Sequence, residues 1–302
     1  MKNTRLEIAT QVKQLYWQLA YLYSKQKLFA YQDTLYSGFL RAAELRLKTG
    51  ETNRLEMISA RSQSLEIKNQ LRQIDDDLLI ANQKLQTVLN VQTTLYPVDT
   101  VLRRIDYLPV VENSVLSGNP SVGYVNHQIE VTKLEKKVES SRLLPDLSIG
   151  YFSQTNQGTQ EINGVPRTFT VGDRFTGIQA GIAIPIWFVP NAAKIKAARF
   201  KEKAAQTNAE YYSKSMSGNY RSLLFEFRKN SSSVDYYEKQ AIPEAGLSIE
   251  QASKSYKAGE MDYSEYILNL NRALGIKQNY LDALNNYNQN IISIDFITGK
   301  IY

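Results

Sequence analysis

The chain has 302 residues and a formal net charge of +6, with 36 basic and 30 acidic residues; it has no cysteine and one histidine, His127. These counts exclude disulfides, thiolate metal sites, cysteine nucleophiles and the paired histidines of helical zinc motifs. The basic residues are scattered among the acidic ones without a long run, which favours a mixed-charge surface over nucleic-acid binding. Only 15 glycines and 8 prolines are present, so long uninterrupted helices are expected.

The first 93 residues have two long apolar registers separated by a break at Gly50. In the first register, apolar residues step alternately by four and three, with interruptions only at Gln26 and Asp33. Its members are Ile8, Val12, Leu15, Leu19, Leu22, Phe29, Tyr36, Leu40, Ala43 and Leu47. The second register runs from Met57 to Val88. A sustained 3.5-residue repeat is typical of supercoiled helices, so residues 1–93 are predicted to form an antiparallel coiled-coil hairpin, roughly 60 Å long at 1.5 Å per residue.

In the middle of the chain the 3.5-residue apolar repeat ends, and farther along apolar and polar residues alternate. Residues 94–118 contain Pro97, Pro109 and Gly118 and are predicted to be a connector. Asn119-Pro120 is a good helix start. Two alternating segments of about ten residues flank a polar stretch at 155–176, which predicts a β-hairpin over 147–187 with a long polar loop. Strands of this length can also cross a membrane at a tilt.

The last third is again helical. We expect a long helical hairpin over 191–297, with a kink at Pro243 and a turn at residues 258–262. With the preceding helix and strands it is predicted to form the second repeat of the chain, residues 119–302, after the first, incomplete repeat at 1–93. The predicted fold class is therefore mainly α, with long antiparallel coiled-coil helical hairpins and a small β-hairpin element.

The two predicted helical turns are similar in sequence. Residues 48–56 (KTGETNRLE) align with 257–265 (KAGEMDYSE) at a constant offset, with the lysine, the glycine and two glutamates identical. This similarity indicates an internal duplication. The first copy has the helical hairpin only, so we expect its missing helix and strands to precede Met1, in a longer protein of which this chain is the C-terminal portion.

Several stretches together resemble one known family. They are Leu143–Gly150 (LLPDLSIG), Ile182–Ile186 (IAIPI), Ile242–Ala245 (IPEA), Ser255–Glu260 (SYKAGE), Phe39–Arg46 (FLRAAELR) and Lys48–Thr52 (KTGET). Their order and spacing resemble the TolC-like outer-membrane efflux proteins, and the first hairpin most resembles the branch that serves heavy-metal pumps of the resistance-nodulation-division class. In that branch the duct can be fused behind the pump polypeptide.

The resemblance implies a passive function without catalysis or a cofactor. It implies a homotrimeric outer-membrane conduit of a tripartite efflux system. The partners would be a periplasmic adaptor (membrane fusion) protein, which docks on the conduit, and an inner-membrane pump of the resistance-nodulation-division class. The transported substrates would be heavy-metal cations. The β-hairpin would lie in the outer membrane and the helices in the periplasm, with no nucleic-acid partner. The alternative left open is a soluble coiled-coil scaffold whose β-hairpin docks on a partner.

The candidate site residues lie at the two turns. The resemblance implies adaptor docking at eight of them, which are Lys48, Thr49, Gly50, Glu51, Lys257, Ala258, Gly259 and Glu260. An ordinary glycine helix stop is the alternative at both turns. Asp262 and Glu265 are candidates for an acidic constriction that selects cations, although a helix-capping role for Asp262 fits better. No metal-ligand set is predicted.

The tyrosines and one acidic run have simple interpretations. Most of the 20 tyrosines fall on predicted helices, where packing between helices is expected instead of a membrane-interface girdle; examples are Tyr16, Tyr21, Tyr31, Tyr211 and Tyr236. Asp75, Asp76 and Asp77 are consecutive, so they cannot share one helix face, and we expect a solvated surface there instead of an ion site.

Overall fold

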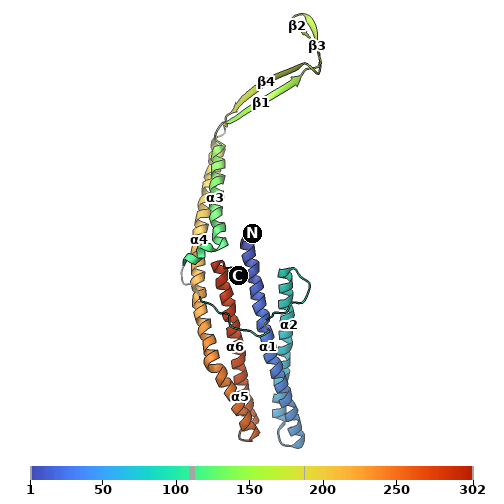
Figure 1. The fold of residues 1–302 in the computed structure, drawn as a ribbon, viewed down its shortest axis with the longest axis vertical. Helices are drawn as coiled ribbons and strands as arrows, with labels where there is room; N and C mark the ends of the chain where they lie inside the picture. Colours follow the sequence, from blue (N-terminus) through green and yellow to red (C-terminus); the bar gives the residue numbers. More distant parts are fainter. Residues whose placement is uncertain (1, 99, 109–112, 187, 301–302) are drawn as a thin grey trace. The chain divides into compact units, whose positions relative to one another are not determined.

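The computed structural model describes residues 2–98, 100–108, 113–186 and 188–300, and it confirms the predicted fold class (Figure 1). The elements in chain order are α1 (Lys2–Thr49), α2 (Arg54–Leu89), the 3₁₀ turn η1 (Asn113–Gly118), α3 (Pro120–Ser141), β1 (Asp146–Thr155), β2 (Gly158–Ile162), β3 (Val165–Phe169), β4 (Arg174–Ala183), α4 (Phe188–Tyr236), the π-helical turn η2 (Tyr237–Ala241), α5 (Ile242–Lys257) and α6 (Tyr263–Thr298). Pro109 of the predicted connector and residue 187 at the predicted end of the β-hairpin lie outside the described residues.

The chain divides into two compact units. Residues 1–123 and 213–302 form the first unit, and residues 124–212 form the second.

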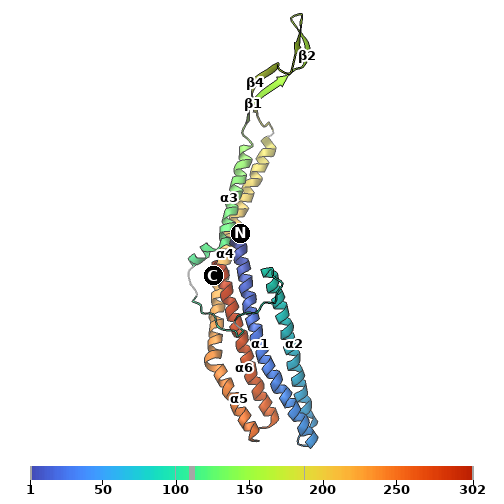
Figure 2. The same cartoon turned by 45° about the vertical axis from the view of Figure 1, so that its right-hand side comes forward.

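In the first unit the helices pack side by side in the order α2, α1, α6, α5 (Figures 1 and 2). The 3.5-residue register explains the packing, because its members Leu19, Leu22, Phe29 and Tyr36 are all buried. They pack against apolar residues of the neighbouring helices, which are Ile67, Ile74, Leu78, Ala81, Leu85, Leu270 and Leu274. The result is a layer of helices in which each helix uses one narrow apolar stripe per neighbour.

The predicted kink at Pro243 coincides with a change in helix type. Proline has no N–H and its ring crowds the carbonyl four residues earlier, so the regular hydrogen-bond ladder cannot pass through it. The backbone responds just before the proline with the π-helical turn Tyr237–Ala241, in which the Ile242 N–H donates to the Tyr237 carbonyl. Figure 2 shows the bend between α4 and α5.

The connector is a strap held by buried polar side chains. The Leu102 N–H donates to Ser24 Oγ on α1 (2.7 Å), and the Ile105 N–H donates to Asn288 Oδ1 on α6 (3.1 Å). Asn82 on α2 both accepts from the Leu95 N–H and donates to the Leu95 carbonyl. A segment without regular structure therefore satisfies its backbone on three helices, which explains why these polar side chains are buried.

In the second unit β1 and β4 pair antiparallel, with Ile149 opposite Ala180 and Tyr151 opposite Ile178. The expectation of a long polar loop over 155–176 was wrong, because β2 and β3 form a second hairpin there. Its turn is Asn163-Gly164, where both residues have positive φ (54° and 79°), as a type I′ turn requires. The second long strand begins at Arg174 and ends at Ala183, earlier than the predicted end at Ile186.

Candidate functional site

The two helical turns have the same backbone geometry. At the first, Gly50 has φ +77°, its N–H donates to the Leu47 carbonyl, and the Glu51 N–H donates to the Arg46 carbonyl at 2.8 Å. At the second, Gly259 has φ +75°, its N–H donates to the Tyr256 carbonyl, and the Glu260 N–H donates to the Ser255 carbonyl at 2.9 Å. Both are Schellman motifs, and equivalent residues occupy equivalent positions in them.

Helix caps follow each turn at the same spacing. Asn53 Oδ1 accepts from the Glu56 N–H (2.9 Å), and Asp262 Oδ1 accepts from the Glu265 N–H (2.8 Å). Asp262 is therefore the N-cap of α6, as the capping alternative predicted. The Glu265 side chain is exposed in the first turn of α6, where a carboxylate is favoured by the helix dipole.

All eight residues predicted for adaptor docking are exposed in this structure. The Schellman motif itself does not distinguish these turns, because the same hydrogen-bond pattern ends α2 at Asn90 and α6 at Gly299. What distinguishes them is the pair of flanking charges, with Lys48 and Glu51 at one turn and Lys257 and Glu260 at the other.

An aromatic cluster that the sequence analysis missed joins α1 to the second turn. Phe39 on α1 packs edge-on against Tyr263 (6.2 Å between ring centroids) and Tyr266 (5.4 Å), and Tyr266 stacks on Tyr256 at 4.7 Å. Burial raises the pKa of both Tyr36 and Tyr263 to about 12, so neither titrates near neutral pH. The cluster holds the ends of the two hairpins together. The signal that could have found it is the presence of Phe39, Tyr256 and Tyr263 within about three helical turns of the glycines.

The helix-packing expectation for the tyrosines holds only in part. Tyr16 and Tyr21 are partly buried, and the Tyr21 hydroxyl donates to Asp282 Oδ1 at 2.6 Å. Tyr31, Tyr211 and Tyr236 are about half exposed or more, so the packing prediction was wrong for these three. Helical position alone does not decide burial when the helices form a layer that leaves two faces uncovered.

The strap carries a second polar cluster, centred on Arg104. Its guanidinium donates to Asp235 (2.7 Å), Glu238 (3.3 Å) and Ser231 (3.0 Å) and lies 4.9 Å from the centroid of the Tyr287 ring. The Arg104 hydrogen bond lowers the pKa of Asp235. Because Glu238 lies within η2, the strap is tied to the π-helical turn that precedes the bend.

The β1–β4 hairpin has two chemically different faces. One face carries Leu147, Ile149 and Tyr151 of β1, paired with Ile182, Ala180 and Ile178 of β4. The three β1 side chains are 71–86% exposed, which is unusual for apolar side chains of a folded protein. The opposite face carries Ser148, Gly150, Gln179 and Gly181, with Phe152 lying over Gly177. One side is therefore suited to an apolar environment and the other to water.

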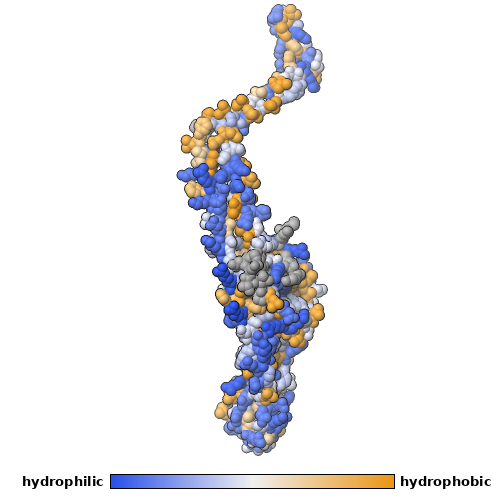
Figure 3. Space-filling model, turned by 60° about the vertical axis from the view of Figure 1, so that its left-hand side comes forward, coloured by the Kyte–Doolittle hydropathy of each residue, from blue (hydrophilic) through white to orange (hydrophobic). Residues whose placement is uncertain are grey.

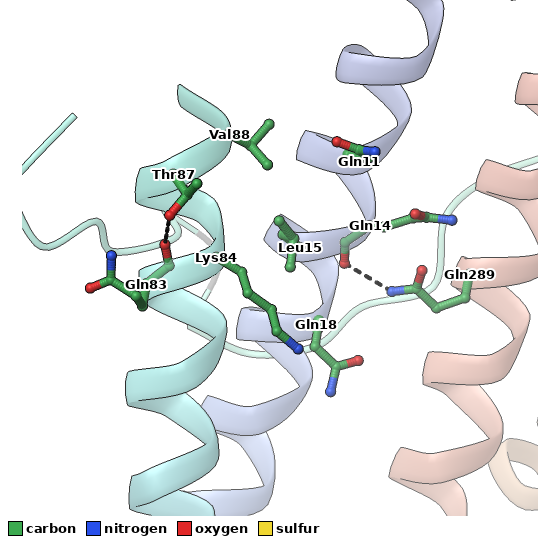
Figure 4. A pocket seen from close by; sticks show the side chains of 9 residues that line it. All are labelled: Gln11, Gln14, Leu15, Gln18, Gln83, Lys84, Thr87, Val88 and Gln289. Atoms are coloured by element: carbon green, nitrogen blue, oxygen red, sulfur yellow. Dashed lines mark hydrogen bonds between the residues drawn. The ribbon is translucent and has the colours of Figure 1, made fainter. Parts of the chain in front are cut away.

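One groove of the first unit is lined mainly by glutamine side chains. It has a volume of about 580 Å³ and lies where α1 and α2 face each other (Figure 4). Its lining residues are Gln11, Gln14, Leu15, Gln18, Gln83, Lys84, Thr87, Val88 and Gln289. Amides dominate this lining, with Lys84 and Thr87 as its other polar side chains, and no carboxylate is among them. Gln289 is engaged with the Gln14 carbonyl at 3.0 Å.

Within the described residues, no group of three or more histidine, cysteine or acidic side chains is placed to hold a metal ion. Asp75, Asp76 and Asp77 are exposed, and Asp75 accepts a hydrogen bond from Gln26. Across the same part of the chain, the helices are too polar for any of them to span a membrane.

Comparison with known proteins places the fold. No family model matches the chain, and no curated protein matches it. Solved structures do match: the CmeC outer membrane channel of Campylobacter jejuni (TM-score 0.83, 15% identity, 99% of this chain and 64% of that one), the outer-membrane channel OprN (0.86, 14%, 99% and 67%) and CusC (0.81, 16%, 98% and 69%).

The chain thus spans about two thirds of the length of these structures. At such identities the likeness establishes the fold, which is that of the TolC-like outer-membrane channels, as the resemblance predicted. CusC does not stand above the other channels, so the comparison gives no specific support to the heavy-metal branch.

Proposed function

We propose that this chain forms part of the outer-membrane channel of a tripartite efflux system and acts as a passive conduit. The observation that carries the proposal is the β1–β4 hairpin, in which alternate residues of 147–151 and 178–182 form an exposed apolar face opposite a face that carries Ser148, Gly150, Gln179 and Gly181. That alternation is what a strand between lipid and water needs. The fold shared with outer-membrane channels supports the same conclusion. In this proposal the hairpin lies in the outer membrane and the helices lie in the periplasm.

Assembly from several copies is part of the proposal. The helices of the first unit form a layer, and its edge helix α2 leaves large apolar side chains uncovered. Ile58, Leu65 and Leu79 are 48–70% exposed and occur at multiples of seven residues, the spacing of a coiled-coil seam. A neighbouring copy would cover this row. Three copies is the number that the resemblance implies.

The two turns are proposed as docking points for a periplasmic adaptor. Both are exposed, both have the same backbone, and both present a lysine and a glutamate beside the glycine. Two equivalent turns in one chain would offer one adaptor tip the same surface twice. Beside them, Glu265 supplies the free carboxylate of the proposed acidic constriction, whereas the Asp262 carboxylate caps α6.

A susceptibility panel tests the function. A strain lacking the gene would be grown with copper, silver, zinc, cobalt and cadmium, and separately with dyes and detergents. We expect sensitivity to the metals, because heavy-metal cations are the substrate class implied by the resemblance. The wild-type gene should restore growth, and a Glu51→Lys/Glu260→Lys gene should not.

The matched control is Glu66→Lys, a charge reversal at an exposed position on α2 away from the turns, which should restore growth. Sensitivity to organic compounds alone would support the proposed conduit function but reject heavy-metal cations as its substrates. Unchanged growth on every compound, in a strain without another channel of this fold, would contradict the proposed function.

A further inference from the structure

We propose that the helix ends adjoining the β1–β4 hairpin bind the anionic phospholipid headgroups of the membrane leaflet on the helix side. The inference rests on the proposed function, because it takes the hairpin to be the membrane-crossing element. It adds a lipid ligand and a binding surface on α3 and α4. All of its residues lie within the second unit.

Positive charge is concentrated at these helix ends. Residues 133–142 and 188–203 contain nine basic and three acidic residues, a net charge of +6, which equals the net charge of the whole chain. The far end of the hairpin differs, since residues 156–173 contain only Glu161, Arg167 and Asp173 as charged groups. Figure 3, which is coloured by hydropathy, shows orange side chains on the hairpin next to the helices and mainly blue side chains on the adjoining helices.

Most of these cations have no partner in the protein. Three of the nine are paired: Arg142 with Glu139 (2.9 Å), Lys136 with Glu202, and Lys133 with Glu130 (3.8 Å). Within the described residues, the remaining cations beside the hairpin are exposed and form no ion pair; we call them the basic belt. The belt consists of Lys137, Lys194, Lys196, Arg199, Lys201 and Lys203. Glu135 lines the same groove as Lys194 and Lys201 but forms no ion pair with them among the described residues, so the six cations of the belt are available to an external anion.

The belt lies at headgroup depth if the hairpin spans the lipid. α4 begins at Phe188, five residues after β4 ends at Ala183, and its first side chains Phe188 and Val189 are 59% and 81% exposed. At 1.5 Å per residue, Lys194 lies roughly 9 Å and Arg199 roughly 16 Å along the helix from Phe188. Long basic side chains can extend back toward the interface. Lys201 and Lys203 lie farther along α4 than Arg199, and the added distance is shorter than the Debye length of about 8 Å.

The distribution of the belt around α4 favours a lipid surface over an acidic protein segment. Lys194 and Lys201 are seven residues apart and share one side of the helix, where they line a groove shared with α3. Lys196, Arg199 and Lys203 follow at steps of three and four on another side. A docking peptide would contact one stripe, whereas headgroups surrounding a helix end can contact both sides. Each cation near an anionic surface strengthens binding, and salt screens the effect.

Vesicle flotation of the full chain tests the proposal. The purified chain would be reconstituted by detergent removal with vesicles of phosphatidylcholine, or of phosphatidylcholine with phosphatidylglycerol, at low and high NaCl. We expect stronger association with the anionic vesicles, and the preference should disappear at high salt. Lys194→Gln/Lys196→Gln/Arg199→Gln should reduce the preference about tenfold or more, while its association with phosphatidylcholine vesicles stays unchanged.

One control variant and two competing ligands distinguish lipid headgroups from other anions as the ligand of the basic belt. Arg54→Gln/Lys68→Gln/Lys84→Gln removes the same charge from exposed positions on α2 and should keep the preference. Inorganic phosphate should compete no better than NaCl of equal ionic strength; stronger competition would identify a free-phosphate site and overturn the lipid assignment. Poly-glutamate binding that depends on the same three residues, without a lipid preference, would overturn it in favour of an acidic protein.

The failure of this inference differs from the failure of the proposed function. Equal association with both kinds of vesicle at every salt concentration would reject the basic belt and leave the membrane hairpin standing. If the chain did not associate with phosphatidylcholine vesicles, the hairpin would be rejected as a membrane element. The proposed role of the basic belt would then be rejected as well, because it depends on the hairpin being in the membrane.

Discussion

Gly50 and Gly259 occupy the left-handed region of backbone conformation, at φ +77° and +75°. No atom lies within 4 Å of a Cβ built at either position, so space does not restrict the residue there. The backbone conformation does restrict the residue, because at positive φ the Cβ of an L-residue makes a steric contact with its own peptide groups. The turns therefore require glycine for a local reason, whatever docks on them.

Gly50→Ala or Gly259→Ala should lower the free energy of unfolding by about 1 kcal/mol. Gly246→Ala is the matched control, because Gly246 lies within α5 with equally open surroundings and without a positive φ. It should raise stability by up to about 1 kcal/mol, since alanine is the better helix former. Urea unfolding of the three variants measures this. Equal effects at all three positions would show that the positive φ carries no cost.

Asp295 is a buried carboxylate in the last turn of α6. Its Oδ2 lies 3.8 Å from Lys13 Nζ, and within the described residues its Oδ1 has no hydrogen-bond partner. Burial raises the pKa of Asp295, and the charges of Lys13 and Lys300 oppose this rise only in part. A carboxylate at a helix C-terminus is also unfavourable toward the helix dipole. The ionised form therefore destabilises the folded state.

Asp295→Asn should raise stability at pH 7 by about 1 kcal/mol. A raised folded-state pKa gives stability that is complete below the unfolded pKa near 4 and is lost as pH rises through the folded pKa. The advantage of the variant should therefore vanish below about pH 4. Chemical unfolding at pH 7 and pH 3 measures it. Lys13→Gln should have the opposite effect at pH 7, and a stability loss in Asp295→Asn at pH 7 would contradict the argument.

At the scale of elements, the β1–β4 hairpin sets adjacent residues in opposite environments. Ile178 lies on the apolar face opposite Tyr151, and Gln179 lies on the polar face opposite Gly150. A one-residue step in a strand reverses the face, so two neighbouring substitutions of the same kind compare the proposed lipid-facing side with the polar side.

Ile178→Arg should abolish stable membrane integration, because an arginine on a lipid-facing strand position costs about 2–4 kcal/mol near the bilayer centre. Gln179→Arg should leave integration nearly unchanged. Carbonate extraction of cell membranes, followed by detection of the chain in the pellet, distinguishes the two. Similar extraction of both variants would show that the exposed apolar face does not contact lipid.

The elements also show where sequence reasoning reaches its limit. The helices of the first unit follow from the register of Leu19, Phe29 and Tyr36, because the residues that pack are close in the chain and repeat. The β2–β3 hairpin was missed although Asn163-Gly164 is a strong local signal for a type I′ turn. The strap could not be predicted, because Ile105 depends on Asn288, which is 183 residues away. At the candidate site, the repeated turns were predictable from their sequence. The aromatic cluster was missed, because the nearby aromatic residues alone do not show that Phe39 of α1 packs against Tyr263 and Tyr266 of α6.

At the scale of the whole molecule, the first unit is a layer of helices and the second carries an exposed apolar hairpin. Neither arrangement covers its own apolar surface, as the exposed Leu65 and Leu79 on α2 and Ile149 on β1 demonstrate. Isolated hairpins are marginal in water and need partners. These surfaces are explained together if the hairpin lies in a membrane and neighbouring copies cover the helices.

The central claim is that the hairpin crosses the outer membrane with the helical turns on the periplasmic side. The chain has no cysteine, so single introduced cysteines report accessibility without background. Gln160→Cys, in β2 at the far end of the hairpin, and Ala258→Cys, in the second turn, would each be treated with a membrane-impermeant maleimide in intact cells. We predict labelling of Gln160→Cys in intact cells, and labelling of Ala258→Cys only after the outer membrane is permeabilised. Equal labelling of both positions before permeabilisation, or protection of both, would contradict the account.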